Sequence, residues 1–235
     1  MDQVISSPLF GVVLSLFAFE FALLLSKKVK TPILNPLLVS QILIIAVLMI
    51  FGISFEDYDK GGQLISFFLG PATVILAVPL YKKLDLLKSN ALPILIGIFI
   101  GCLVGVISIV LLAYALGLDI VLVKSLSPKS VTIPIGVEIT NQLQGIPAIT
   151  VVAILVTGIL GAVIGPTVCK IFKIKDKISV GVSIGTASHA VGTTKALELG
   201  EIEGAMSSLS IGIAGLFTVF LAPFILNIMG NILGF

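Results

Sequence analysis

The sequence predicts an all-α polytopic integral membrane protein with about seven or eight transmembrane elements, some of them broken or re-entrant helices. Hydrophobic residues make up 57% of the 235 residues and charged residues only 11%, whereas about a quarter of a soluble domain is charged. The mean hydropathy is +1.23. Several uncharged runs exceed the roughly 18–20 residues that cross a bilayer core. We therefore expect a single transmembrane domain over residues 1–235.

Seven apolar runs are candidate crossings, and the links between them are charged and rich in turn formers. The runs are Gln3–Ser26, Ile33–Phe55, Gly61–Tyr81, Ser89–Leu118, Ile146–Cys169, Ile178–Thr194 and Gly204–Phe235. The first run lacks a basic leader region and a small-residue cleavage site, so it is predicted to be a retained span.

Lysine placement predicts the orientation of these runs, because cytoplasmic loops of membrane proteins are enriched in Lys. Lysines follow the first and third runs, which predicts an outside N-terminus, and the acidic link "SFEDYDKGG" fits an outer loop. Four more lysines lie between residues 170 and 177. A single crossing by Leu118–Gly145 would put that cluster outside. Re-entry of this segment as a hairpin of two half-helices keeps the cluster inside and is the favoured alternative.

Two weakly similar halves, residues 1–117 and 118–235, are a further alternative. The segment "LGPAT" at Leu69–Thr73 resembles "IGPTV" at Ile164–Val168, and "TPILNPLL" resembles "SVTIPIGV" about half a chain later. Many transporters consist of two such halves and bind substrate at broken helices. Chance similarity between apolar helices explains the same pairs equally well.

Two polar stretches interrupt the apolar sequence. The first, "SPKSVTIP" at residues 127–134, contains two prolines that oppose helix formation. The second, "GTASHAVGTT" at residues 185–194, contains two glycines, four hydroxyl residues and His189, the only histidine of the chain. Irregular backbone at membrane depth is tolerated only inside protein or beside a water-filled cavity. Both stretches are therefore predicted to form one substrate cavity.

Residues in and near these stretches are the predicted site. The predicted substrate-binding residues are Asn35, Lys129, Ser130, Thr132, Ser188, His189, Gly192 and Thr193. Free N–H groups at helix breaks bind carboxylates, and hydroxyls can complete the coordination. Gly185 and Gly192 would let the backbone break. The single candidate cation in the site is Lys129, since the chain has no arginine, and this favours monocarboxylates over dicarboxylates.

His189 and Glu138 are the candidate proton carriers. Imidazole titrates near neutral pH, and ionisable groups inside membranes are costly and usually functional. Each residue has a structural alternative, because His189 could bond a helix carbonyl and Glu138 could lie at the membrane interface. Likewise, Asn35 could simply begin the second run, and Lys129 could extend to the lipid headgroups.

A stripe of glycines, Gly97, Gly101 and Gly105, is predicted to let two helices pack closely, with a sliding surface as the alternative. No motif for ATP hydrolysis, intramembrane proteolysis or nucleic-acid binding occurs in the sequence. We expect neither an enzyme nor a cofactor or metal site.

Five segments resemble the LrgB/CidB family. They are "LNPLL" (34–38), "DYDKGGQLISFFLGPATVILAVPLYKK" (57–83), "PKSVTIPIGVEI" (128–139), "TGILGAVIGP" (157–166) and "GTASHAVGTTKALELGEIEGAMSS" (185–208). The resemblance covers nearly the whole chain. It implies a multi-pass protein of the bacterial plasma membrane that works with a small LrgA/CidA-like membrane protein. It is compatible with a homo-oligomer and implies no nucleic-acid partner.

The resemblance implies two functions. Bacterial members of the family are named as holin- and antiholin-like regulators of murein hydrolase activity and lysis. Other members, including a chloroplast relative, carry small carboxylates such as glycolate, glycerate or pyruvate. A holin forms lesions from simple helices and needs no polar breaks at membrane depth, whereas a carrier does. The sequence therefore favours a proton-coupled monocarboxylate carrier, with a lysis regulator without selective transport as the alternative.

Overall fold

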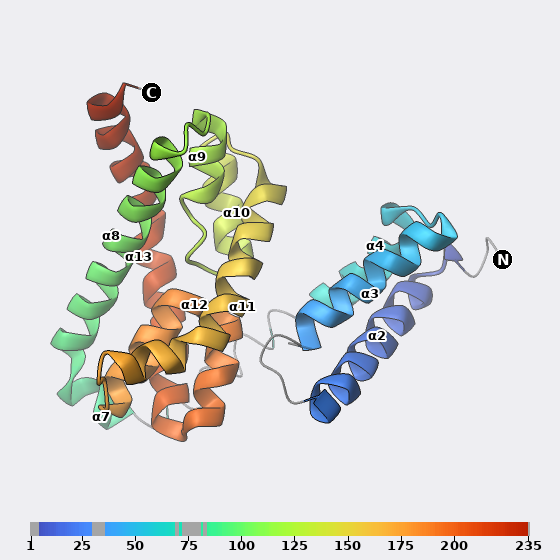
Figure 1. Ribbon diagram of the computed structural model, residues 1–235, viewed down its shortest axis with the longest axis horizontal. Coiled ribbons are helices and arrows are strands. Elements are labelled where there is room, and N and C mark those ends of the chain that lie inside the picture. Colours follow the sequence, from blue (N-terminus) through green and yellow to red (C-terminus); the bar gives the residue numbers. More distant parts are fainter. Residues whose placement is uncertain (1–4, 30–35, 69–70, 72–80, 82–83, 235) are drawn as a thin grey trace. The chain divides into compact units, whose positions relative to one another are not determined.

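The computed structural model describes residues 5–29, 36–68, 71, 81 and 84–234, which form helices joined by short turns (Figure 1). Four helices of these residues are long and apolar enough to cross a membrane: α2 (Pro8–Val29), α8 (Ala91–Ala115), α11 (Pro147–Ile171) and α13 (Glu201–Leu233). The predicted all-α polytopic membrane fold is confirmed. The chain divides into two compact units, Met1–Ile75 and Leu76–Phe235. The predicted halves 1–117 and 118–235 stay a prediction.

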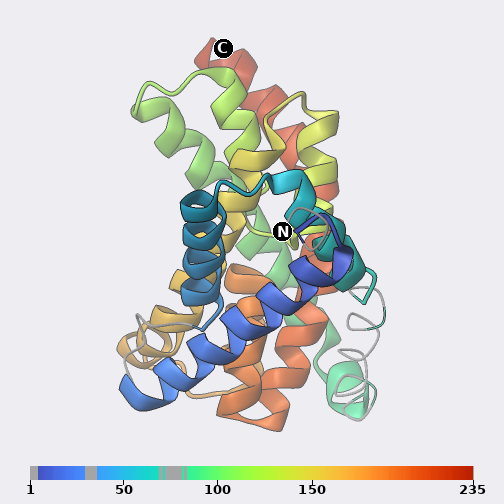
Figure 2. The same ribbon diagram turned by 90° about the vertical axis from the view of Figure 1, so that its right-hand side faces the viewer.

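In the first unit, α2 packs against both α3 (Pro36–Phe51) and α4 (Phe55–Ser66), as Figure 2 shows. The α2–α4 approach depends on two glycines, because a Cβ atom added at Gly61 would lie 2.6 Å from the Cα of Gly11. Next to them, the hydroxyls of Ser15 and Tyr58 are 2.9 Å apart.

The predicted outer loop "SFEDYDKGG" is largely helical. Its Ser54 is the N-cap of α4, and the Ser54 hydroxyl accepts a hydrogen bond of 3.1 Å from the Asp57 backbone N–H. A serine at this position satisfies a free donor of the first helical turn. Most of the predicted crossing Gly61–Tyr81 lies outside the described residues, as does Asn35.

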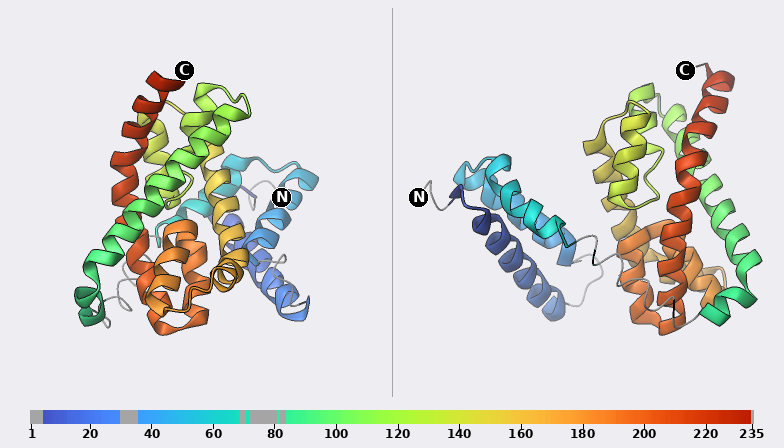
Figure 3. Two further views of the ribbon diagram at one scale, coloured as in Figure 1. Left: turned by 60° about the vertical axis from the view of Figure 1, so that its left-hand side comes forward. Right: turned by 180° about the vertical axis from the view of Figure 1, so that it is seen from behind.

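The second unit is built on α8, α11 and α13, which run its length, while α7 (Leu84–Ser89) precedes α8 (Figure 3). The helices α8 and α13 run in the same direction, since Ile94 packs near Met206 and Val110 packs near Ala222. One hydrophobic cluster joins the first halves of these helices to α12 (Lys177–Leu199). The other joins their second halves to α9 (Ile120–Leu126) and α10 (Ile133–Gln142).

The segment after α8 turns back on itself. At 1.5 Å per residue, α9 and α10 are only about 10 and 15 Å long, too short to cross a bilayer core of about 30 Å. The chain returns to α9, because the Ser125 hydroxyl near the end of α9 accepts a hydrogen bond of 2.7 Å from the Ile146 backbone N–H after α10. The favoured hairpin of two half-helices is confirmed, and the single crossing is wrong.

Another hairpin lies inside α12. Its backbone breaks at His189, where φ is 46° and ψ is −130°. Both halves of α12 lie beside the same residue of α13, because Gly185 contacts Ser207 and the Thr193 hydroxyl lies 2.7 Å from the Ser207 hydroxyl. Ile184 and Gly192 are also in contact, although a straight helix would separate residues eight apart by about 12 Å.

The predicted crossing Ile178–Thr194 is therefore wrong, although the predicted break within it is confirmed. The chain enters along residues 177–188, turns at His189 and returns along residues 190–199. Composition does not distinguish a broken span from such a hairpin, since both need apolar half-helices around a polar turn.

The two hairpins have an inverted arrangement in the second unit. The helix α8 is followed by the α9–α10 hairpin, and the oppositely directed α11 is followed by the α12 hairpin (Figures 1 and 3). The direction of α11 follows from its contacts, because Thr150 bonds to Ser125 in α9 while Gly161 contacts Ser188 in α12. The two hairpins therefore enter from opposite ends.

Candidate functional site

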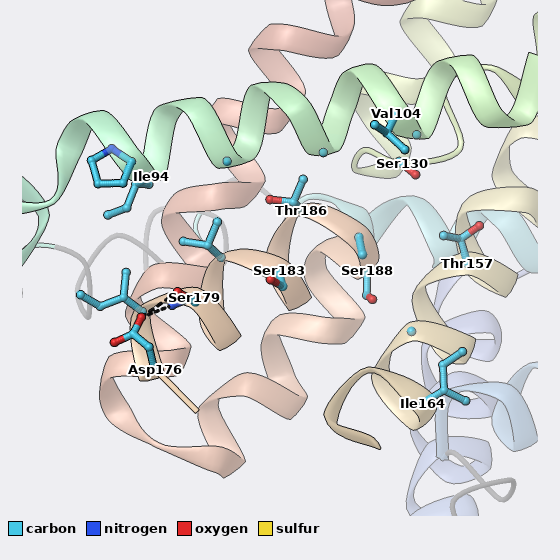
Figure 4. A pocket seen from close by; sticks show the side chains of 18 of the residues that line it. Ile94, Val104, Ser130, Thr157, Ile164, Asp176, Ser179, Ser183, Thr186 and Ser188 are labelled. Carbon is cyan, nitrogen blue, oxygen red and sulfur yellow. Dashed lines mark hydrogen bonds between the residues drawn. The ribbon is translucent and has the colours of Figure 1, made fainter. Parts of the chain in front are cut away.

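A cavity of about 910 Å³ lies between α8, α11 and the first half of α12 (Figure 4). The turn between α9 and α10 closes the deep end of the cavity, which we call its inner end; the opposite end, at the start of α12, is its outer end. Polar side chains occur along the whole length of its walls: Asn90, Lys129, Ser130, Thr157, Asp176, Ser179, Ser183, Thr186 and Ser188. The outer end is lined by the exposed residues Asp176 and Ser179 at the start of α12.

Lys129 and Ser130 are held at the inner end of the cavity by the turn between α9 and α10. Pro128 and Pro134 flank this turn, and the backbone is helical again only from Ile133. The Lys129 ammonium donates a hydrogen bond of 3.2 Å to the Ser130 hydroxyl. Among the described residues Lys129 has no ion-pair partner, so its positive charge is not neutralised by this part of the chain.

The turn of α12 meets the turn between α9 and α10. Ser188 is 2% exposed and packs against Gly161 of α11, where a larger residue would displace it. His189 follows and is also 2% exposed. The backbone of Ser130 and the ammonium of Lys129 lie near its imidazole ring.

Neither ring nitrogen of His189 has a hydrogen-bond partner among the described residues. Most buried polar groups are hydrogen-bonded, so a buried ring without partners requires an explanation. Imidazole can take up a proton or donate to a ligand. The nearby Lys129 ammonium opposes a proton on the ring, and an anion bound next to both groups would offset that repulsion.

The structure brings together the inner part of the predicted site. Lys129, Ser130 and Ser188 line the cavity, and His189 lies at the turn directly after Ser188. Gly192 is buried at the closure of the hairpin, where an added Cβ would meet Ser188 and Ile184.

Three other predicted residues have no place in the cavity wall. Thr193 is buried, and its hydroxyl donates 2.9 Å to the His189 carbonyl, so it holds the turn. Thr132 is the N-cap residue of α10 but makes no side-chain cap bond. Glu138 is exposed on α10, where its carboxylate accepts a 3.3 Å bond from Gln142.

Several residues of the cavity wall have no predicted role. Ser179, Ser183 and Thr186 are separated by four and three residues, a spacing that puts them on one helix face, and this signal was available in the sequence. The glycine stripe also faces the cavity. An added Cβ at Gly97 would meet no atom within 4 Å, and one at Gly101 would lie 2.9 Å from the Thr186 methyl.

This arrangement is suited to binding a small anion. It combines one lysine, several hydroxyls and a buried histidine with a largely apolar wall, a composition typical of small-molecule sites. In the part of the chain that the structure describes, no three His, Cys, Asp or Glu side chains come together as metal ligands.

The model of the LrgB-like family matches residues 15–228. Among curated proteins, the chain is 39% identical to "Uncharacterized protein YxaC" of Bacillus subtilis, over 91% of this chain and 93% of the relative. It is 38% identical to "Antiholin-like protein LrgB" of Bacillus cereus, over 95% of this chain and 98% of the relative. No solved structure matches the chain significantly. The chain therefore belongs to the LrgB-like family.

Proposed function

We propose that this protein carries small monocarboxylates across the membrane, coupled to protons. The observation that carries the proposal is the meeting of two re-entrant turns at the inner end of a cavity, with Lys129, Ser130, Ser188 and His189 between them. Re-entrant or broken helices that meet near the middle of the membrane are typical of substrate sites in secondary transporters.

A carboxylate in the cavity would be held by Lys129 and the hydroxyls of Ser130 and Ser188. Hydrogen bonds to charged groups contribute roughly 1.5–3 kcal/mol, and a single ammonium neutralises a single carboxylate. Apolar side chains of the wall, including Leu160 and Ile164, suit a short hydrocarbon part. A monocarboxylate, with one negative charge, matches the single positive charge of Lys129.

Proton coupling would follow from the proximity of His189 to this carboxylate. A bound anion favours a proton on the nearby imidazole, because opposite charges attract strongly where water is excluded. Release of the anion favours loss of the proton again. Neither ring nitrogen has a hydrogen-bond partner among the residues that the structure describes, which supports this role.

Movement of the hairpins would expose the site to alternate sides. The cavity reaches the end of the second unit where α12 begins, next to Lys170, Lys173 and Lys175, which the lysine pattern predicts to be cytoplasmic. The inverted pair of hairpins would allow a second, oppositely directed opening to form, as in transporters with inverted repeats.

Proteoliposomes test the proposal. We would measure uptake of radiolabelled pyruvate and glycolate under an imposed pH gradient, with an entrapped dye to report leakage, both with and without an LrgA/CidA-like small membrane protein. Saturable uptake with the dye retained is the expected result. Uptake without saturation, or dye loss, contradicts a carrier.

Two lysines give a matched pair of variants. We expect Lys129→Gln to raise KM by about tenfold or more, since about 1.4 kcal/mol corresponds to a factor of ten. Lys195→Gln should change KM less than about twofold, because Lys195 pairs with Glu198 at 2.7 Å on the surface.

His189→Gln should remove the dependence of uptake on the pH gradient, and wild-type dependence in this variant excludes His189 as the proton carrier.

A regulator of murein hydrolase activity and lysis, without selective transport, is the second candidate. The relatives named "Antiholin-like protein LrgB" favour it. It predicts dye leakage or binding to the small membrane protein, with no preference among solutes. A third outcome, neither uptake nor leakage even with the small protein present, would favour a regulatory subunit.

A further inference from the structure

Thr186 is an outlier among the buried hydroxyl residues of this protein. Its side chain is 8% exposed and lines the cavity, yet its hydroxyl oxygen has no hydrogen-bond partner among the described residues. Other buried threonines in helices donate to the carbonyl four residues earlier. Thr140 does so at 2.8 Å, Thr193 at 2.9 Å and Thr218 at 2.7 Å. A local partner of the same kind exists for Thr186, but its hydroxyl does not use it.

The place of Thr186 relative to the inner end of the cavity follows from the glycine stripe of α8. Gly105 faces the Ser130 hydroxyl, 3.8 Å from an added Cβ, and Gly101 faces the Thr186 methyl at 2.9 Å. The two glycines are one helical turn apart, about 6 Å along the axis. Thr186 therefore lies about one turn from the Lys129–Ser130 pair, on the way to the outer end (Figure 4).

The contact with Gly101 also narrows the cavity. One turn farther out, an added Cβ at Gly97 meets no atom within 4 Å, so the wall is open there. Threonine populates two side-chain rotamers in helices, because its hydroxyl can take more than one position. Rotation about the Cα–Cβ bond can move the hydroxyl to the position that the methyl occupies here, which would bring the unpaired hydroxyl to a ligand.

We infer that Thr186 recognises a 2-oxo or 2-hydroxy group on the carried monocarboxylate, and that Gly101 opposite it limits the width of that substrate. The carboxylate binds Lys129 and Ser130, and the neighbouring oxygen of a two- or three-carbon acid reaches the Thr186 hydroxyl. This inference rests on the proposed carrier function and assigns specificity to a residue outside the Lys129–His189 cluster.

The test compares pyruvate with propionate, which lacks the 2-oxo group, in the same proteoliposomes. We expect wild-type protein to prefer pyruvate and Thr186→Val to reduce that preference at least fivefold, through KM rather than the maximal rate. Thr186→Ser, which keeps the hydroxyl, should retain the preference. An unchanged preference in Thr186→Val overturns the recognition role.

Gly101→Ala tests the width limit, and Gly97→Ala is the matched control on the same helix. We expect Gly101→Ala to reduce uptake of a branched 2-oxo acid more than tenfold and that of pyruvate less than threefold. Gly97→Ala should follow the wild type with both substrates. Equal behaviour of the two variants overturns the width limit. Absence of saturable uptake in the wild type overturns the carrier function as well.

Discussion

The α9–α10 hairpin and the α12 hairpin both begin at an aspartate that caps the first half-helix, Asp119 in one and Asp176 in the other. They reverse direction differently. The first uses a turn of several residues next to Pro128, whereas the second reverses at His189 alone, with φ at 46°. A positive φ is uncommon outside glycine, so the second turn is the more strained.

The hairpins also differ in how their buried polar groups are satisfied. In the first hairpin the Thr140 and Thr150 hydroxyls lie 2.7 Å apart, and Thr150 donates 2.8 Å to the Ser125 carbonyl. In the second, the hydroxyl of Thr186 and both ring nitrogens of His189 lack partners among the described residues. Strain and unpaired groups concentrate at functional sites. We therefore regard the first hairpin as the fixed wall and the second as the part that responds to ligand.

Glycine-to-alanine substitutions should give the largest difference in stability between the two hairpins. A Cβ at Gly185 in α12 would meet the backbone of α13, lying 2.7 Å from the Ser207 Cα. Backbone cannot move aside cheaply, so we expect Gly185→Ala to destabilise the protein by about 3 kcal/mol. The midpoint of thermal unfolding of the purified protein in detergent, followed by size-exclusion chromatography, measures the loss.

The corresponding test in the first hairpin is Gly136→Ala. An added Cβ there meets the far end of the Ile154 side chain, with the Thr150 methyl at 3.3 Å. These side chains can yield, and alanine favours helix by about 1 kcal/mol over glycine. Gly136→Ala should therefore change stability by less than about 1 kcal/mol. If the two variants were equally destabilised, the difference in packing between the hairpins would not exist.

Removal of a hydroxyl should give a smaller effect that still differs between the hairpins. Thr140→Val and Thr193→Val each break a buried hydroxyl pair, and each should cost about 1 kcal/mol of stability. We expect Thr193→Val also to reduce pyruvate uptake severalfold, because Thr193 bonds to the His189 carbonyl and thereby holds the turn. Thr140→Val should leave uptake per folded molecule within about twofold of the wild type.

Uptake and thermal unfolding of the same preparations distinguish these expectations. An equal loss of uptake in both variants would mean that the first hairpin is as much a part of the moving site as the second. Ser208→Ala serves as the control for hydroxyl removal, since within the described part of the chain Ser208 bonds only to the Gly204 carbonyl of its own helix.

The membrane class, both polar breaks and the first hairpin could be predicted from the sequence. Prolines at 128 and 134 and the lysines after residue 170 constrain that hairpin by backbone chemistry and by charge. The second hairpin could not be predicted, because a broken span and a returning hairpin have the same hydropathy. What selects the hairpin is the contact of Gly185 and Thr193 with the same residue, Ser207, and contacts across sequence are not visible in composition.

The candidate site was predictable to a similar extent. Lys129, Ser130 and Ser188 stand out as polar residues in apolar surroundings, and all three line the cavity. Glu138 and Thr193 stand out equally in the sequence, yet one is exposed and the other bonds within the hairpin. The direction of a side chain decides between these outcomes, and the turns fix that direction only once the chain is folded.

The capping aspartates should show the smallest difference between the hairpins. The Asp176 carboxylate accepts bonds of 2.8 Å from both the backbone N–H and the hydroxyl of Ser179, whereas Asp119 accepts one bond of 2.9 Å from the Leu122 N–H. Asp176→Ala should therefore cost about 1 kcal/mol at neutral pH, and Asp119→Ala somewhat less. Asp176→Asn should cost only a few tenths of a kcal/mol, since Asn is an equally good N-cap.

Stability measured at low pH separates the contribution of the Asp176 charge from that of its hydrogen bonds. The two bonds from Ser179 hold the pKa of the Asp176 carboxyl below its ordinary value of 3.8. A carboxyl whose pKa is lower in the folded state stabilises the fold fully above the unfolded pKa, and this stabilisation is lost as the pH falls through the folded pKa. The stability of the wild type relative to Asp176→Asn should therefore decrease only below about pH 4. A constant difference between the two proteins across that range would mean that the cap of α12 works equally well with a neutral side chain, and that charge at the cavity's outer end contributes nothing to holding the hairpin.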